Sequence, residues 1–157
     1  MSAGPFDLET RVTDADHTAL RLWLRLLTCT NLIEADVRRR LRAGFTSTLP
    51  RFDLLAQLER SRDGLRMSEL SRRLMVTGGN ITALTEQLDA EGWLTREPEP
   101  DDRRATRVRL TRRGRERFAA MAGEHERWVR ELLSPLDKHE QLTLLDLLGK
   151  LKAGIRA

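Results

Sequence analysis

The chain has 157 residues, a third of them charged, and its formal net charge is only +4. A single cysteine, Cys29, excludes a disulfide framework and a cysteine-based zinc cluster. No stretch is apolar enough to cross a membrane, and the first residues include acids rather than a signal-peptide core. We therefore expect a cytoplasmic protein without metal, cofactor or membrane contact.

The apolar residues and the basic residues each come mainly from one or two amino-acid types. Leucine and alanine outweigh four Phe, three Trp and no Tyr, which favours packing of helix on helix. Arginine supplies most of the positive charge, because Lys138, Lys150 and Lys152 are the only lysines. Arginine forms bidentate contacts with phosphate and guanine, which favours a nucleic-acid partner, although a genome rich in G and C would give the same composition. That alternative does not explain the clustering of arginines between residues 96 and 109.

The N-terminal part is expected to form an arm, two helices and a short strand. Residues 1–12 lack periodicity, and a long helix is predicted over about 15–42, ended by Gly44. Its two apolar stripes predict contacts both with its own chain and with a second subunit. A shorter helix is predicted over about 50–61, with Phe52, Leu54, Leu55 and Leu58 facing inward. A strand at 65–66 can then pair with a later hairpin.

A helix-turn-helix pattern follows. The first helix rests on Leu70 and Leu74, which share one face, with Ser68 as its cap. Two glycines after Thr77 then turn the chain into a second helix. Its buried side is expected to be Ile81, Leu84 and Leu88. The opposite, exposed face is expected to be Asn80, Thr82, Ala83, Glu86 and Gln87. Because Lys and Arg are absent from Thr77 to Glu91, this face can read bases only if another segment supplies the attraction.

The next segment is expected to supply that attraction. Residues 95–97 and 106–110 alternate like paired strands, and the Pro/Asp run between them is typical of a turn. The basic side chains of the segment are Arg96, Arg103, Arg104, Arg107 and Arg109. An arginine at the tip of a thin hairpin can enter a minor groove, which is narrow and electronegative over A·T steps.

The C-terminal part predicts two helices. Thr111 can cap a helix from Arg112 to about Leu133, which Ser134-Pro135 would break. A final helix begins at Asp137 and carries an apolar ridge of Leu144, Leu147, Leu148, Leu151 and Ile155. This ridge needs a cover, and the simplest cover is a second copy of the chain in a symmetric dimer.

Several short motifs follow one another in a fixed order. They are Glu69-Leu70-Ser71, Val76-Thr77, Leu84-Thr85-Glu86-Gln87-Leu88, Glu91-Gly92-Trp93-Leu94, Asp102-Arg103-Arg104, and Leu110-Thr111 with Gly114. In this order they resemble the MarR family of bacterial winged-helix transcription regulators, over nearly the whole chain. The most specific element is the pair Asp102 and Arg104. The resemblance implies that Arg104 reaches into the minor groove, that Asp102 helps to hold the wing and that the helix at 77–91 enters the major groove.

The resemblance implies a mainly α fold with a small β-wing, in which N- and C-terminal helices form a dimerisation lobe. It divides the chain into an arm and dimerisation helix (1–45), a winged helix-turn-helix DNA-binding domain (46–117) and C-terminal dimerisation helices (118–157). A homodimer presents two reading helices to successive major grooves about 34 Å apart, so we expect a palindromic double-stranded operator. The residues expected to contact DNA are Arg72, Arg73, Thr77, Gly79, Asn80, Thr82, Ala83, Gln87, Asp102, Arg103 and Arg104. For Arg72 and Arg73, a solvated helix face is an equally good explanation.

The resemblance also implies an effector, either a small anionic aromatic compound or a larger acyl conjugate, bound beside the dimerisation helices. Candidate residues for its pocket are His17, Trp23, Arg25, Phe45, Arg51 and Phe52. Aromatic rings would stack on the effector and an arginine would pair with its carboxylate. Core packing is the simpler explanation for Trp23 and Phe52. Cys29 is expected to be a buried structural thiol rather than a peroxide sensor.

The leading hypothesis is a homodimeric repressor that leaves its operator when the effector binds. No nucleophile, acid/base pair or phosphate-binding loop is present, so an enzyme is not expected. An alternative is an adaptor that docks a partner protein through the winged helix, since the face of the second helix is neutral to acidic. An enzyme acting on aromatic acids has only the expected pocket in its favour.

Overall fold

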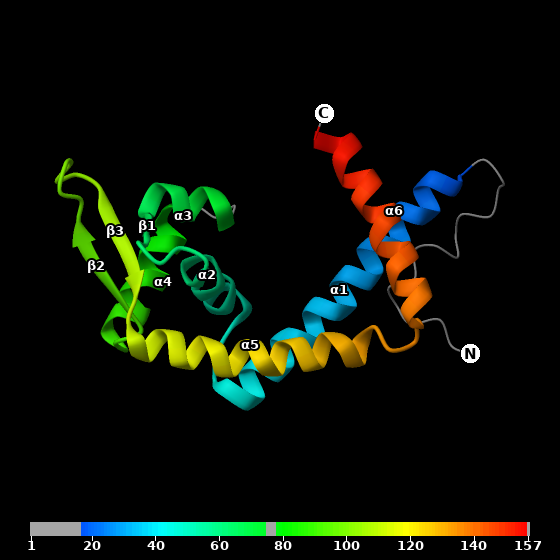
Figure 1. Ribbon diagram of the computed structural model, residues 1–157, viewed down its shortest axis with the longest axis horizontal. Coiled ribbons are helices and arrows are strands. Elements are labelled where there is room, and N and C mark those ends of the chain that lie inside the picture. Colours follow the sequence, from blue (N-terminus) through cyan, green and yellow to red (C-terminus); the bar gives the residue numbers. More distant parts are fainter. Residues whose placement is uncertain (1–16, 75–77, 157) are drawn as a thin grey trace. The chain divides into compact units, whose positions relative to one another are not determined.

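Figure 1 shows the computed structural model of the protein, which describes residues 17–74 and 78–156. The chain divides into two compact units after Gly123. The first unit contains helices α1 (Thr18–Phe45), α2 (Leu49–Glu59), α3 (Met67–Leu74) and α4 (Gly78–Ala90), strands β1 (Leu65–Arg66), β2 (Leu94–Pro98) and β3 (Thr106–Leu110), and the first part of α5 (Arg112–Leu132). The second unit contains the end of α5 and α6 (Lys138–Arg156). The predicted fold class, mainly helical with a small β-wing, is confirmed.

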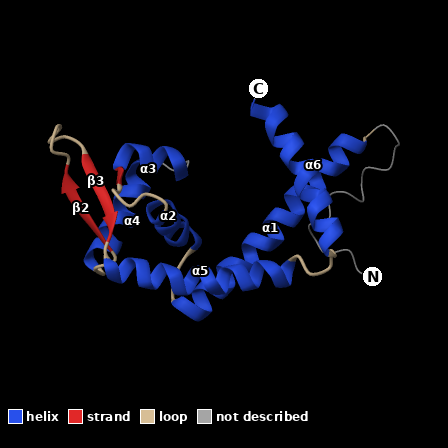
Figure 2. Cartoon of the chain, viewed as in Figure 1, coloured by secondary structure: helices blue, strands red, loops and turns tan. Residues whose placement is uncertain are grey.

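The three strands form one antiparallel sheet in the order β1-β3-β2 (Figure 2). In the β2–β3 hairpin Leu94 pairs with Leu110, and on the other side of β3 Leu65 pairs with Val108. The side chains of these four residues are buried, so one face of the sheet belongs to the core. The predicted hairpin strands are confirmed, with β2 one residue longer at each end.

The core of the first unit is built mainly from leucine. Apart from the sheet, its buried apolar side chains are Val37, Leu41, Phe52, Leu54, Leu55, Leu58, Leu70, Ile81, Leu88, Trp93 and Met121. Burial of each large apolar side chain contributes roughly 1.5–3 kcal/mol. The inward faces predicted for α2 and α4 are therefore the buried ones, and Leu84 is half-buried.

Two threonines cap helices of the first unit. The hydroxyl of Thr48 accepts the N–H of Arg51 at 3.4 Å, with Pro50 in the first turn of α2. The hydroxyl of Thr111 accepts the N–H of Gly114 at 3.0 Å and donates to the carbonyl of Gly92 at 2.7 Å. Thr111 therefore caps α5, as predicted, and also ties its start to the turn that follows α4.

Two predicted helix boundaries are wrong. Gly44 does not end α1, which continues to Phe45 and ends at Thr46 in the left-handed conformation (φ 50°). The N–H groups of Thr46 and Ser47 donate to the carbonyls of Arg42 and Leu41, so hydrogen bonds rather than glycine hold this helix end. Ser68 does not precede its helix either. Because β1 runs directly into α3 at Met67, Ser68 lies inside the first turn.

The second unit is a helix pair joined by a short link. The N–H of Asp137 donates to the carboxylate of Glu140 at 2.8 Å, and the N–H of Glu140 donates to Asp137 at 2.9 Å. This reciprocal capping box explains why α6 begins where the sequence predicts. The large apolar side chains of α6 that are exposed in the single chain are Leu142, Leu144, Leu145, Leu147, Leu148, Leu151 and Ile155.

Some predictions concern residues that the structure does not describe. The arm at 1–12, the helix start near residue 15 and Thr77 lie outside the described ranges. Among residues 17–74 and 78–156, no helix is both long enough and apolar enough to span a membrane.

Replacement of Gly114 by alanine is expected to destabilise the first unit. A Cβ at this position would overlap the carbonyl oxygen of Trp93 at the base of the hairpin, and relief of such overpacking costs about 1–3 kcal/mol. Gly123→Ala is the matched control, because Gly123 lies on the same helix with open space around its Cα. The control should be neutral or stabilise by up to about 1 kcal/mol. Urea unfolding followed by circular dichroism measures both, and an unchanged midpoint for Gly114→Ala would contradict the close approach.

Candidate nucleic-acid interface

Helix α4 presents a polar face to solvent. Ile81, Thr85 and Leu88 are buried, and the hydroxyl of Thr85 is kept inside the helix by a 2.9 Å hydrogen bond to the carbonyl of Ile81. The exposed side chains are Asn80, Thr82, Ala83, Glu86 and Gln87, and Gly79 lies in the first turn. No residue from Gly78 to Ala90 is Lys or Arg. The helix therefore presents hydrogen-bonding groups but no positive charge of its own.

The tip of the β2–β3 hairpin is held by backbone hydrogen bonds around Asp102. The carboxylate of Asp102 accepts the N–H of Arg104 at 3.0 Å, and its carbonyl accepts the N–H of Ala105 at 2.9 Å. Arg103 and Arg104 are both exposed. Among the described residues, neither guanidinium has an ion-pair partner. The turn thus presents two unneutralised cations, and the side chain of Asp102 shapes the turn instead of neutralising them.

Glu99 is buried beside the hairpin. Its carboxylate accepts a hydrogen bond from Nε of Arg107 at 2.5 Å and lies 3.5 Å from Nε of Arg66. Only 4% of the Glu99 side chain is exposed. Arg107 also donates to the carbonyls of Asp63 at 3.1 Å and Gly64 at 3.2 Å. Arg107 therefore joins the hairpin to the turn before β1. The available sequence signal was the position of Glu99 between two prolines, across the hairpin from a basic strand.

Not all the arginines around the hairpin are available to bind a ligand. Nε of Arg96 lies 3.1 Å from Asp89, and its Nη1 lies 3.6 Å from Glu86, so this side chain ties β2 to α4. Arg107 is held by Glu99 as described. Arg96 and Arg107 therefore join elements of the fold, and a neighbouring carboxylate balances much of the charge of each. Arg103, Arg104 and Arg109 have no ion-pair partner within the described residues.

The two arginines predicted on α3 differ from each other. Nη2 of Arg73 lies 2.6 Å from the carboxylate of Glu69, one turn earlier in the same helix. Arg72 is exposed and has no such partner among the described residues. Because a neutralised cation releases fewer counterions from DNA, Arg72 is the better candidate for a phosphate contact.

A groove of about 440 Å³ lies between the hairpin and the helices of the first unit. Its polar lining includes Arg66, Ser68, Thr82, Arg96, Arg104 and Thr106. The groove therefore brings an exposed residue of α4, Thr82, and the hairpin arginine Arg104 to one concave surface.

The residues predicted for an effector pocket are only partly brought together. The guanidinium of Arg51 lies 5.0 Å from the ring centroid of Trp93 and hydrogen-bonds Glu91 through both Nη atoms. The guanidinium of Arg117 lies 5.5 Å from the same ring and 5.4 Å from that of Phe45. Arg51 and Phe45 are thus linked through Trp93, which lies in one of the motifs noted in the sequence, and through Arg117, which the sequence did not single out.

The other predicted pocket residues lie elsewhere. The ring of Phe52 is buried and lies 5.5 Å from that of Phe118, which agrees with core packing. His17, Trp23 and Arg25 are exposed at the start of α1. Arg25 lines a hollow of about 240 Å³ on that helix.

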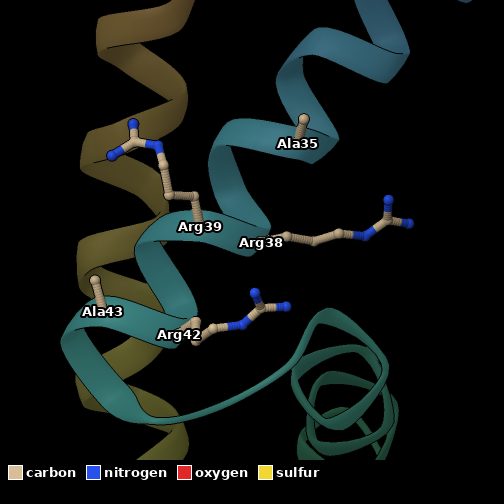
Figure 3. Close-up of a pocket in the computed structure, with 5 residues that line it drawn as sticks. All are labelled: Ala35, Arg38, Arg39, Arg42 and Ala43. Carbon is tan, nitrogen blue, oxygen red and sulfur yellow. The ribbon is translucent and has the colours of Figure 1, made fainter.

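A larger hollow, of about 490 Å³, lies further along α1 (Figure 3). It is lined by Ala35, Arg38, Arg39, Arg42 and Ala43. Figure 3 shows the side chains of Arg38 and Arg42 extending to the same side of the helix, while Arg39 points away from them. Arg38 pairs with Glu34 at 3.0 Å, and Arg42 has no ion-pair partner among the described residues. The hollow therefore carries an unneutralised cation.

Asp36 pairs with two neighbouring arginines of α1. Its carboxylate accepts hydrogen bonds from Arg39 and Arg40. The hydrogen bond from Arg39 lowers the pKa of Asp36, burial opposes this shift, and the hydrogen bond from Arg40 adds to it. Asp36 therefore stays ionised and keeps Arg39 and Arg40 neutralised at neutral pH.

The expectation of a buried Cys29 is wrong. Its side chain is exposed on α1, where Leu22, Trp23 and Leu32 are also exposed. The apolar stripe that carries Cys29 has no complete cover within the described chain. Among the described residues, no three His, Cys, Asp or Glu side chains form a group that could hold a metal ion.

Comparison with known proteins identifies similar chains. A model of the MarR family matches residues 44–105. The chain is 32% identical over 105 residues to the uncharacterized HTH-type transcriptional regulator YdgJ of Bacillus subtilis, covering 67% of this chain but only 63% of YdgJ. It is 31% identical over 124 residues to a second such regulator, YkoM of B. subtilis, covering 79% of this chain and 77% of YkoM.

Among solved structures, the chain resembles Sco3205, a MarR family transcriptional regulator from Streptomyces coelicolor, whose structure is in complex with DNA. The TM-score is 0.76 at 26% identity, and the match covers 94% of this chain and 92% of that chain. The matched proteins are named as transcriptional regulators, not as enzymes.

Replacement of Glu99 by glutamine is expected to loosen the hairpin. The change removes the charge-assisted bond to Arg107 and leaves that guanidinium without its carboxylate, at a cost of about 1.5–3 kcal/mol. Glu97→Gln is the matched control, because Glu97 is exposed on β2 and has no ion pair among the described residues. Urea unfolding and the rate of trypsin cleavage at the hairpin arginines measure the effect. Equal midpoints and cleavage rates for the two variants would contradict a holding role for Glu99.

Proposed function

Because the chain belongs to the MarR family of winged-helix transcription regulators, we propose that it regulates transcription by binding an operator as a homodimer. The observation that carries this proposal is the groove shared by α4 and the hairpin, in which Thr82 and Arg104 lie on one surface. Sco3205, a protein of the same family and fold, is in complex with DNA in its structure, which supports double-stranded DNA as the ligand.

Helix α4 and the β2–β3 hairpin would make different kinds of contact with DNA. The uncharged exposed side chains of α4, chiefly Asn80, Thr82 and Gln87, would read base edges in the major groove. Arg104, at the tip of the hairpin, would enter the adjacent minor groove, where the negative potential attracts an arginine. Arg72 would add a phosphate contact that carries no sequence information. Affinity would then come from the arginines, and specificity from α4.

A homodimer would cover the exposed apolar side chains. Seven leucine and isoleucine residues of α6 are exposed in the single chain, and Leu145, Leu147 and Ile155 are each at least 60% exposed. Exposed apolar patches of this kind mark association surfaces, and a two-fold dimer supplies the same surface twice. Two copies would present two reading helices to a palindromic operator. Sedimentation equilibrium tests this directly, and a monomeric mass at micromolar concentration would overturn it.

An anionic effector would control the operator complex, and the regulator would act as a repressor that the effector releases. Two hollows on α1, one lined by Arg38 and Arg42 and the other by Arg25, are candidate places for the carboxylate of the effector. An effector would act only through different affinities for the DNA-binding and released forms. A thermal-shift screen of aromatic acids and acyl thioesters tests this, because bound ligand stabilises the folded protein.

Replacement of Arg104 by alanine is expected to weaken operator binding by about 5- to 150-fold, equivalent to about 1–3 kcal/mol. The side chain is exposed and has no ion pair among residues 17–74 and 78–156, so the fold should keep its stability. Arg130→Ala is a control of the same charge change, since Arg130 is exposed on the second unit and pairs with Glu126 of its own helix. Fluorescence anisotropy with a duplex from upstream of the gene measures both variants. Unchanged binding by Arg104→Ala would remove the wing from the proposal, and wild-type binding without salt dependence would favour a protein-docking adaptor.

A further inference from the structure

We propose that the groove between α4 and the hairpin seats one sugar–phosphate strand of the operator, with Arg66 as its main phosphate-binding residue. This inference rests on the proposed function, which assigns α4 to a major groove and the hairpin to the adjacent minor groove. On one side of a duplex, those two grooves are separated by a single backbone strand. A protein that enters both must therefore enclose that strand, and this groove of about 440 Å³ lies between the two elements.

The lining of the groove has the chemistry of a phosphate site. Arg66, Arg96 and Arg104 contribute guanidinium groups, and Ser68, Thr82 and Thr106 contribute hydroxyl groups. The acid at its edge, Asp102, already accepts the backbone N–H of Arg104. Arginine and hydroxyl side chains are the usual donors to the phosphate oxygens of DNA.

Among these arginines, Arg96 is the least available. Asp89 lies 3.1 Å from its Nε and Glu86 lies 3.6 Å from its Nη1. Two carboxylates therefore compete with any phosphate, and only 31% of the side chain is exposed. Arg96 can line the groove, but it brings little net positive charge to it.

Glu99 holds Arg66 in place, but the charge of Arg66 is less fully balanced than that of Arg96. Its Nε lies 3.5 Å from Oε1 of Glu99, and that same oxygen accepts Nε of Arg107 at 2.5 Å. The shorter and better bond belongs to Arg107, so one buried carboxylate is shared between two guanidinium groups, which together carry an excess positive charge. Arg66 remains 45% exposed, whereas Glu99 is 4% exposed. Arg66 therefore has donors left for a phosphate in the groove, while Glu99 restrains its position from below.

The test measures how DNA affinity depends on salt for Arg66→Gln and Arg66→Lys. Anisotropy titrations use two duplexes of equal length, one from upstream of the gene and one unrelated. Loss of one phosphate contact lowers the slope of log affinity against log salt by about 0.9. Between about 50 and 200 mM salt, the glutamine variant should therefore lose roughly 3.5-fold less affinity than wild type, on both duplexes. Arg66→Lys keeps the charge and should keep the wild-type slope, as should Arg130→Gln.

The outcomes separate this inference from the proposed function. Wild type that binds neither duplex overturns both. Wild type that prefers the upstream duplex, with an Arg66→Gln slope equal to that of Arg130→Gln, leaves the proposed function standing and overturns the groove. A slope change confined to the upstream duplex would identify a base contact and likewise overturn the phosphate assignment.

A second measurement changes the DNA. Neutral methylphosphonates are placed one at a time along the upstream duplex, and binding by wild type is measured at each position. We expect the affinity of wild type to fall most when the substituted phosphate lies between the bases that α4 reads and the adjacent minor groove. With that substituted duplex, Arg66→Gln should bind no more weakly than wild type. Absence of any sensitive phosphate in that interval would overturn the inference even if the glutamine variant folded poorly.

Discussion

The contacts of Trp93 determine how the hairpin is attached to the helices. Its N–H donates to the carbonyl of Leu88 at 2.9 Å, and its carbonyl accepts the N–H of Thr111 at 3.1 Å. The guanidinium groups of Arg51 and Arg117 lie over its buried ring, and such contacts contribute about 0.5–2 kcal/mol each. Helices α2, α4 and α5 and strand β2 therefore meet at a single residue. A reading helix and a hairpin can act on one duplex only if their relative position is fixed, and this junction fixes it.

Ion pairs with carboxylates determine which arginine side chains of the first unit carry a positive charge that no neighbour balances. Glu99 and the acids of α4 hold Arg107 and Arg96, so these two side chains join elements of the fold. Within the described part of this unit, the arginines without an ion-pair partner include Arg72 on α3, Arg103 and Arg104 at the hairpin tip, Arg109 on β3 and Arg42 on α1. The chain can therefore have a modest net charge although its unbalanced positive charges are unevenly distributed over the surface. Because Arg66 shares its carboxylate with a better-placed neighbour, it keeps donors available in the groove, as the proposed phosphate contact requires.

Local patterns were sufficient to predict most of the fold. Alternation predicted β2 and β3, helical spacing predicted the buried sides of α2 and α4, and Thr111 was identified as a cap because capping acts over three residues. The misses involved contacts distant in sequence. Arg51 and Glu91 are 40 residues apart, and neither the burial of Glu99 nor the exposure of Cys29 follows from its neighbours in the chain. The end of α1 was misplaced because Thr46, rather than a glycine, adopts the left-handed conformation that ends the helix.

Residues 46–117, the segment expected to bind DNA, contain no lysine and no histidine. Every cation there is a guanidinium, which keeps its proton at any pH at which proteins stay folded. Lysine acylation has no acceptor side chain in this segment, and mild acidification has no imidazole to protonate. Metabolic changes that act through acetyl donors or protons would thus leave the electrostatic attraction of this segment intact. Control by lysine acylation or by histidine protonation would have to act on groups outside this segment.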